Sequence, residues 1–160
     1  MEQAVLDEFL LQPHVGVLAS LRQDGRPYTV PIWWLYDDGV FWLTGTTNRI
    51  WCKQLLLDAR CSLCIEALAP VAGHVGIDGM AQACLLPEFD IWPISRRLAE
   101  KYVGQGDPTG AQSEAVEKFF ANMRTEPRML FRLVPDTTRA IDMRVYRGKR
   151  ADREFQGRSR

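Results

Sequence analysis

The chain has 160 residues, of which 46% are hydrophobic and 25% are charged, and these values exclude a wholly disordered protein. Its 20 Lys and Arg residues balance its 20 Asp and Glu residues, so no net charge draws the chain to nucleic acid or to anionic lipid. No apolar run approaches the ~20 residues that cross a bilayer. We therefore expect one compact domain without a nucleic-acid or membrane partner.

The N-terminal part of the sequence predicts a short helix followed by β-hairpins. Residues 2–12 place apolar side chains along one helical face, and Pro13 ends the helix. Asp24-Gly25 between two apolar runs is a strong hairpin signal. Pro31 has no N–H and therefore belongs at an edge, a bulge or a break of the ladder. The strands predicted in this part cover residues 15–21, 28–36 and 40–44.

The rest of the sequence predicts a second helix and then a mixture of strands and helices. Asn48 is expected to cap a helix that runs to about Leu57, with Leu55 and Leu56 facing inward. The glycines of the following long strand suggest a bend or a bulge. The further predicted elements are strands at 61–67 and 74–86, helices at 94–103 and 112–123, and strands at 128–134 and 138–143. Antiparallel strands in such number usually close into a barrel, because closure removes the exposed edges.

The C-terminal end differs in composition from the rest of the chain. Residues 144–160 hold seven Lys or Arg residues against two acidic residues, a balance of +5, and few apolar residues. We therefore divide the chain into a domain over residues 1–143 and a basic, mobile tail over residues 144–160. A tail that lies across a partner subunit, and a tail that contacts nucleic acid, are the alternatives.

The cysteines and histidines give no sign of a metal site or of a nucleophilic enzyme. Cys61 and Cys64 form a C-x-x-C pattern, but residues i and i+3 of a strand point to opposite faces, so core packing is the expected role. Cys52 and Cys84 are expected to be buried apolar thiols. No nucleophile elbow surrounds any Ser, and we assign no catalytic residue and no metal ligand. Few cysteines and no secretion signal favour a cytoplasmic protein.

The segment of residues 44–53 joins a predicted strand to a predicted helix. It offers threonine hydroxyls, the flexible Gly45, backbone N–H groups at a helix start, and the cations Arg49 and Lys53. Orphan amides, a favourable helix dipole and charge-assisted hydrogen bonds are the elements of a phosphate site. The alternative is a capped surface helix whose cations are solvated.

Tryptophan is concentrated in one part of the chain. Four of the five Trp residues fall between Trp33 and Trp51. A strand that is interrupted by Pro31 and flanked by Trp33 can present backbone amides and a ring face to a flat heterocycle. A barrel core filled with Trp is the alternative.

The order of these motifs resembles the FMN-binding split-barrel proteins that are similar to pyridoxamine 5′-phosphate oxidase, and within them the flavin/deazaflavin oxidoreductases. The segments that carry the resemblance are VGVLASL (15–21), DGRP (24–27), VPIW (30–33), RIWCKQL (49–55), DAR (58–60), IDGMA (77–81), LAEKY (98–102) and FRLVP (131–135). Together they cover about residues 5–143.

The resemblance implies a mainly β fold, a six-stranded antiparallel split β-barrel with α-helices. It also implies a homodimer with a cofactor groove between the subunits, in which Trp33 and Trp34 are expected to line the apolar patch. The function implied is that of an oxidoreductase acting on a small organic substrate. FMN is the expected cofactor and the deazaflavin coenzyme F420 is the alternative. A non-catalytic carrier or binder of a flavin, a deazaflavin or another flat ligand is the alternative function.

The resemblance also implies a set of cofactor-binding residues, with the ring along residues 30–33 and the phosphate near the segment 44–53. These residues are Val30, Pro31, Ile32, Trp33, Thr44, Thr46, Thr47, Arg49, Trp51 and Lys53. The sequence departs from the family pattern at three places, because Trp51, Gln54 and Ala59 stand where the family has Lys, Asn and Pro. No His follows Asp142, so oxidation of vitamin B6 is not predicted.

Overall fold

A computed structural model describes residues 1–104 and 110–146, and the side chains of all of these except residues 110–113. From residue 147 on, the expected tail lies outside the described residues. The helices are α1 (Gln3–Leu11), α2 (Ile50–Leu57), α3 (Trp92–Val103), α4 (Gly110–Met123) and the 3-10 helix η1 (Met143–Tyr146). The strands are β1 (Gly16–Leu21), β2 (Pro27–Ile32), β3 (Trp34–Asp37), β4 (Val40–Thr46), β5 (Arg60–Ala67), β6 (Gly73–Cys84) and β7 (Arg128–Asp142).

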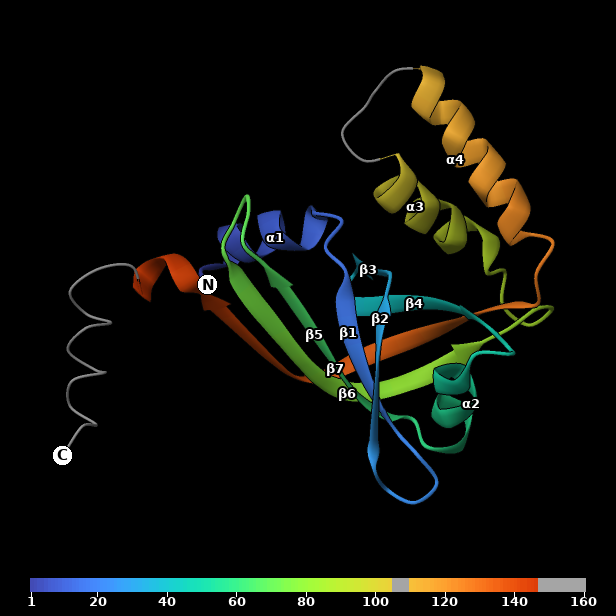
Figure 1. The fold of residues 1–160 in the computed structure, drawn as a ribbon, viewed down its shortest axis with the longest axis horizontal. Coiled ribbons are helices and arrows are strands. Elements are labelled where there is room, and N and C mark those ends of the chain that lie inside the picture. Colours follow the sequence, from blue (N-terminus) through green and yellow to red (C-terminus); the bar gives the residue numbers. More distant parts are fainter. Residues whose placement is uncertain (105–109, 147–160) are drawn as a thin grey trace.

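The strands form one antiparallel sheet in the order β2-β1-β5-β6-β7-β4-β3. Its two edge strands, β2 and β3, are consecutive in the chain and are separated by Trp33 alone. One residue spans only ~3.5 Å, so the sheet must curl until the end of β2 meets the start of β3 (Figure 1). The split barrel expected from the sequence is confirmed. Its strand count is seven rather than six, because the second strand is interrupted.

The expected continuous strand over residues 28–36 is therefore wrong. Ile32 pairs with β1, whereas Trp34 pairs with Leu43 of β4, so the chain changes its partner strand within two residues. The Tyr102 hydroxyl accepts a hydrogen bond from the Trp34 N–H at 3.1 Å and holds the chain at this point. Pro31 lies on the edge strand β2, where the missing N–H costs no central ladder bond.

The two strands expected near the C-terminal end, at 128–134 and 138–143, form one continuous strand, β7. The register jumps between Asp78 and Gly79, which pair with Thr137 and Pro135, so Asp136 is an extra residue opposite the irregularity. The predicted break at Pro135 is thus a β-bulge within a continuous strand. Gly79 is required there, because a Cβ atom would meet the carbonyl oxygen of the opposite strand.

The barrel interior is closed at two different ends by helices α1 and α2 (Figure 1). Phe9 of α1 and Leu55 of α2 belong to the same buried cluster as the inward-facing strand residues. The helix expected from Asn48 begins later, at Ile50, with Arg49 in the N-cap position and no side-chain cap bond. The Arg49 N–H donates to the Thr46 carbonyl oxygen, so a turn replaces the first predicted helical turn. Leu56 is exposed, contrary to expectation.

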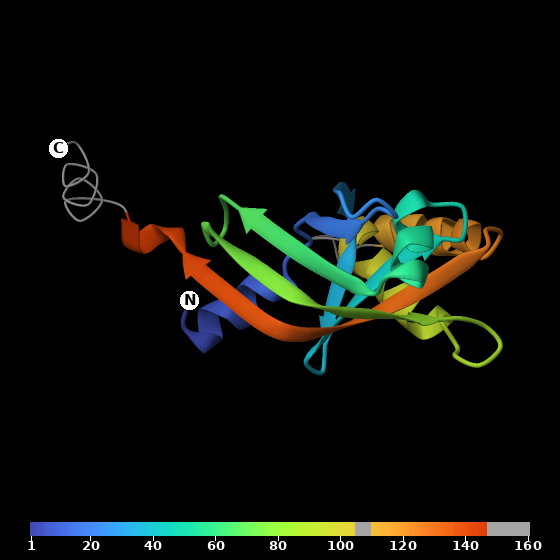
Figure 2. The same ribbon diagram turned by 90° about the horizontal axis from the view of Figure 1, so that it is seen from below.

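Helices α3 and α4 lie side by side and form a second layer, in which α3 packs on β3 and β4 (Figure 1). Trp34 was expected to line an exposed patch, but it is fully buried in the barrel core. Burial is possible because its indole N–H has a partner: it donates to the His14 carbonyl oxygen at 2.7 Å. Figure 2 shows β6 and β7 as long neighbouring strands, with η1 beyond the end of β7. Among the helices of the described residues, none has the length and apolarity needed to span a membrane.

The four cysteines are free thiols. Cys61 is buried and Cys64 is exposed, so the pair does point to opposite faces of β5, and core packing is wrong for Cys64. Cys52 is fully buried as expected, whereas Cys84 is half-buried.

Candidate functional site

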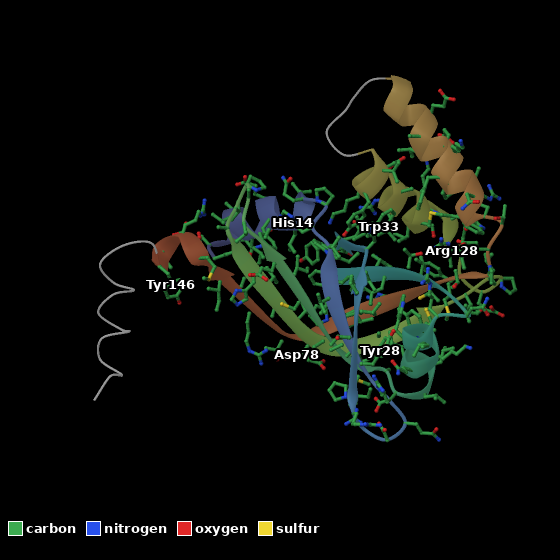
Figure 3. The ribbon with its side chains drawn as sticks, viewed as in Figure 1. His14, Tyr28, Trp33, Asp78, Arg128 and Tyr146 are labelled. Carbon is green, nitrogen blue, oxygen red and sulfur yellow. The ribbon has the colours of Figure 1, made fainter. Side chains whose placement is uncertain are left out.

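A cavity of about 470 Å³ lies beside the strand break at Trp33. Its volume falls within the range of about 300–1,000 Å³ that is typical of small-molecule sites. In the view of Figure 3, Trp33 and Arg128, two of its lining residues, lie below the helices α3 and α4. The lining residues are Val15, Val30, Pro31, Ile32, Trp33, Thr44, Gly45, Thr46, Arg49, Trp51, Phe119 and Arg128.

The first wall of the cavity is the edge strand β2 with the residue that follows it. Part of the backbone N–H and C=O groups of an edge strand have no partner within the sheet, so this wall can hydrogen-bond a ligand. The Trp33 ring is held in a fixed plane, because it stacks on the Tyr102 ring at 4.6 Å between centroids and 2° between planes. Phe119 of α4 contacts the same ring at 5.4 Å.

The second wall comes from the end of β4 and the start of α2. Gly45 lets the helix approach the strand closely, because a Cβ atom at this position would collide with the Cys52 thiol and the Trp51 ring. Trp51 is only 4% exposed, and its ring lies 5.5 Å from that of Phe131 in the core. Trp51 therefore closes the inner side of the cavity against water rather than standing free within it.

The third wall is the start of β7, where Arg128 lies directly opposite Thr46 in the ladder with β4. The Arg128 side chain is 15% exposed. One terminal nitrogen donates weakly to the Thr44 hydroxyl at 3.4 Å, and the other pairs with Glu126. The buried Nε–H of Arg128 has no hydrogen-bond partner among the described residues. Three other buried side-chain atoms of the described residues also lack a partner, namely His14 Nε2, Trp42 Nε1 and Ser95 Oγ, but Arg128 alone of these four residues lines the cavity.

The charges around the cavity are of one sign. Arg49 and Arg128 line it, and among the described lining residues there is no Asp, Glu, His or Cys. Burial raises the pKa of the neighbouring Cys52 thiol to about 12, and both arginines act in the opposite direction on the same thiol. Two guanidinium groups thus act on one small region, which favours an anionic ligand.

A larger hollow of about 570 Å³ lies beside α1, β3 and α3. Its charged side chains already have partners. Arg97 is paired with Asp37 and Glu100 with Arg96, and the Lys101 Nζ donates to a backbone carbonyl oxygen of α1 at 3.0 Å. The unpaired buried donor therefore distinguishes the smaller cavity as the candidate site.

The structure brings eight of the ten residues expected from the sequence to this cavity. The other two, Thr47 and Lys53, are exposed and are not among its lining residues. The Thr47 N–H donates to the Pro127 carbonyl oxygen at 3.0 Å. Val15, Phe119 and Arg128 were not expected.

The unexpected residues lie outside the two segments that the motifs marked. Phe119 and Arg128 are remote in sequence from both segments, and a lone Arg at the start of a strand carries no signal of its own. Only the pairing of β7 with β4 reveals its position.

Comparison with known proteins identifies one family. Residues 3–142 match the family model described as Pyridoxamine 5′-phosphate oxidase. Among the curated proteins, none matches this chain.

Three similar solved structures illustrate the likeness of fold. A conserved hypothetical protein from Mycobacterium tuberculosis is 25% identical, with a TM-score of 0.69 over 90% of this chain and 86% of that one. A protein named F420 reductase is 18% identical, with a TM-score of 0.61 over 83% of this chain and 94% of that one. A FAD-binding protein from Mesorhizobium loti is 18% identical, with a TM-score of 0.56 over 88% of this chain and 94% of that one.

Proposed function

We propose, because the chain belongs to the pyridoxamine 5′-phosphate oxidase family over residues 3–142, that it is an oxidoreductase that binds FMN, or alternatively the deazaflavin coenzyme F420, in the cavity beside Trp33. Its second reactant is a small organic molecule. The observation that carries the proposal is the cavity itself, in which an edge strand with a fixed aromatic ring faces two arginines and two threonine hydroxyls.

The residues present fit a flat ligand with an anionic end. The backbone of Val30–Trp33 would hold the polar edge of the ring system, while Thr44, Thr46 and Arg49 would hold the phosphate. The structural observation that favours an anionic ligand is the presence of two guanidinium groups, those of Arg49 and Arg128, in a described lining that contains no acidic side chain. Two similar structures are named F420 reductase and FAD-binding protein, and these names accord with this ligand class. At 18% identity, the likeness to each of them shows the fold alone.

The chain's own contribution to the reaction would be binding and positioning. A flavin or deazaflavin ring, when bound, supplies the hydride and electron chemistry. The stack of Trp33 on Tyr102 fixes the ring face of the cavity, and buried Trp51 excludes water from its inner side. The described lining has no acid–base side chain, so the residues here orient the reactants rather than move protons.

We also propose a homodimer that covers the outer face of the sheet next to the cavity. Val17 is 43% exposed and pairs with Pro31 of β2 on one side and Cys64 of β5 on the other, and both of these are exposed as well. Val15, 49% exposed, continues this face and lines the cavity. A second copy placed here would bury the apolar face and complete the open side of the site. The four free thiols accord with a cytoplasmic location.

The proposed function is tested with the purified full-length chain. We expect a flavin or deazaflavin absorbance spectrum, or binding on titration with FMN or F420, followed by reduction and reoxidation with a suitable donor and acceptor. If neither cofactor binds below roughly 100 µM, about −5.5 kcal/mol, the proposal is wrong.

A non-catalytic flavin carrier is the second candidate function. Its supporting observation is Trp51, which closes the cavity where a further cation was expected from the family pattern. Tight binding of FMN without reduction by NAD(P)H, and without turnover of any acceptor, would favour the carrier.

A further inference from the structure

We propose that Arg128, at the start of β7, is the second cationic anchor of the cavity, and that with Arg49 it binds the phosphate of the bound ligand. This inference rests on the proposed function. It assigns the role expected for Lys53 to a residue from the opposite end of the sequence, because Lys53 is exposed and does not line the cavity.

The position of Arg128 is set by the ladder between β7 and β4. Thr46 and Arg128 are direct partners, so their side chains project from the same face of the sheet. Thr44, two residues earlier on β4, projects from that face too, and its hydroxyl lies 3.4 Å from an Arg128 terminal nitrogen. Two hydroxyls and one guanidinium are thereby gathered on one rigid surface. This gives a phosphate both charge and directed hydrogen bonds.

The hydrogen bonds of Arg128 leave capacity for a ligand. One terminal nitrogen makes only a weak contact with the Thr44 hydroxyl at 3.4 Å, while Glu126 engages the other terminal nitrogen. The buried Nε–H has no partner among the described residues. A phosphate oxygen in the cavity would be a stronger acceptor for the terminal nitrogen that now makes only the weak contact with Thr44.

The acidic side chain of Glu126 affects how strongly Arg128 can attract an anion. Its carboxylate is 41% exposed and is the only acidic partner of Arg128 within the described part of the chain. It holds the guanidinium in place but also offsets its charge. Replacement of this carboxylate by a neutral amide should therefore strengthen the binding of an anion. Loss of the guanidinium should weaken it.

The experiment compares FMN with riboflavin, which has the same ring system without the phosphate. Both ligands are titrated into the full-length apo protein and into its Arg128→Ala, Arg128→Lys and Glu126→Gln variants, with Arg124→Ala as the matched control. Arg124 is an exposed arginine nearby in the sequence that does not line the cavity. The readout is the ratio of the FMN and riboflavin affinities, which does not depend on activity.

Arg128→Ala should lower the affinity for FMN roughly 10- to 100-fold, as for loss of a charge-assisted hydrogen bond, and leave that for riboflavin almost unchanged. The affinity of Arg128→Lys for FMN should lie between those of Arg128→Ala and the unmodified protein, because a point charge replaces a planar fork. Glu126→Gln should raise the affinity for FMN, an increase that damage to the fold would not produce. Arg124→Ala should behave as the unmodified protein.

Two outcomes would overturn the inference: an unchanged FMN to riboflavin ratio in Arg128→Ala, or an equal loss for both ligands. If Arg128→Ala fails to fold, the opposite shifts expected of Arg128→Lys and Glu126→Gln decide the matter. If the unmodified protein binds neither FMN nor F420, the proposed function fails instead. The anchor is then tested alone with inorganic pyrophosphate, whose protection against thermal unfolding should be weaker in Arg128→Lys than in the unmodified protein; equal protection would refute the inference.

Discussion

Thr46 and Arg128 face each other directly across β4 and β7, at the point where β4 ends and the chain turns toward α2. This pairing joins the segment that the sequence marks as a phosphate site to a residue far along the chain. It also places a guanidinium group beside the hydroxyls of Thr44 and Thr46, and the cavity beside Trp33 gains its second cation in this way.

The two cations of the expected phosphate segment should differ in their effect on ligand binding. Arg49 lines the cavity and Lys53 does not. Arg49→Ala should weaken FMN binding by about 1.5–3 kcal/mol, the worth of a charge-assisted hydrogen bond, and Lys53→Ala should cost much less. Isothermal titration of both variants checks this, and an equal or larger loss for Lys53→Ala would contradict it.

Gly45 should tolerate no side chain. A Cβ atom there would collide with the Cys52 thiol and the Trp51 ring, so Gly45→Ala should lower the free energy of unfolding by about 1–3 kcal/mol through overpacking. Gly76 is the matched control, because a Cβ atom there meets nothing within 4 Å. Gly76→Ala should change the free energy of unfolding by at most about 0.5 kcal/mol. Urea denaturation measures both, and similar losses would refute the prediction.

The cysteines should differ sharply in reactivity. Cys64 is exposed on β5, whereas Cys52 and Cys61 are buried and burial raises the pKa of each thiol to about 12. The proposed dimer would cover Cys64, which pairs with Val17, so the labelling is done on the Val17→Asp variant, which should be monomeric. Since the thiolate is the reactive form, a thiol reagent at pH 8 should label Cys64 of this variant first and leave Cys52 and Cys61 unlabelled until the protein unfolds. Peptide mass spectrometry identifies the labelled residue. Early labelling of Cys52 in the folded protein would show that α2 does not pack as described.

The same buried thiols predict a loss of stability at alkaline pH. The thiol of Cys52 keeps its proton in the folded chain up to about pH 12 but ionises near pH 9 when unfolded. The contribution of this thiol to the free energy of unfolding is therefore fully present below about pH 9 and declines as the pH rises from 9 toward 12. The free energy of unfolding of Cys52→Ala should fall less steeply between pH 8 and 10 than that of the unmodified protein. Parallel slopes would exclude this contribution.

The outer face around Val17 should mediate dimer formation. Light scattering of the unmodified protein should give twice the mass of one chain, and Val17→Asp should shift the mass toward one chain, since a charge would be buried in the interface. Leu57→Asp is the control, because Leu57 is an 81% exposed apolar residue on α2 rather than on this face. A monomeric unmodified protein would refute the proposed dimer.

Local features of the fold could be predicted from the sequence because they depend on residues close together in the chain. The hairpin turn at Asp24-Gly25, the edge position of Pro31 and the opposite faces of Cys61 and Cys64 follow from backbone chemistry and the two-residue period of a strand. Two short segments, 30–33 and 44–51, supply most of the cavity lining, and each already carried a recognisable motif.

Only the tertiary structure decided which distant residues meet these segments. The change of partner strand at Trp33 depends on Tyr102, whose hydroxyl bonds the backbone there, and no local pattern records that contact. The continuity of β7 depends on Gly79 of another strand, where the bulge forms. The register of β7 against β4 then places Arg128 opposite Thr46. Strand register is fixed by long-range pairing and by which face is buried, and the residue that completes the candidate site is set by that pairing.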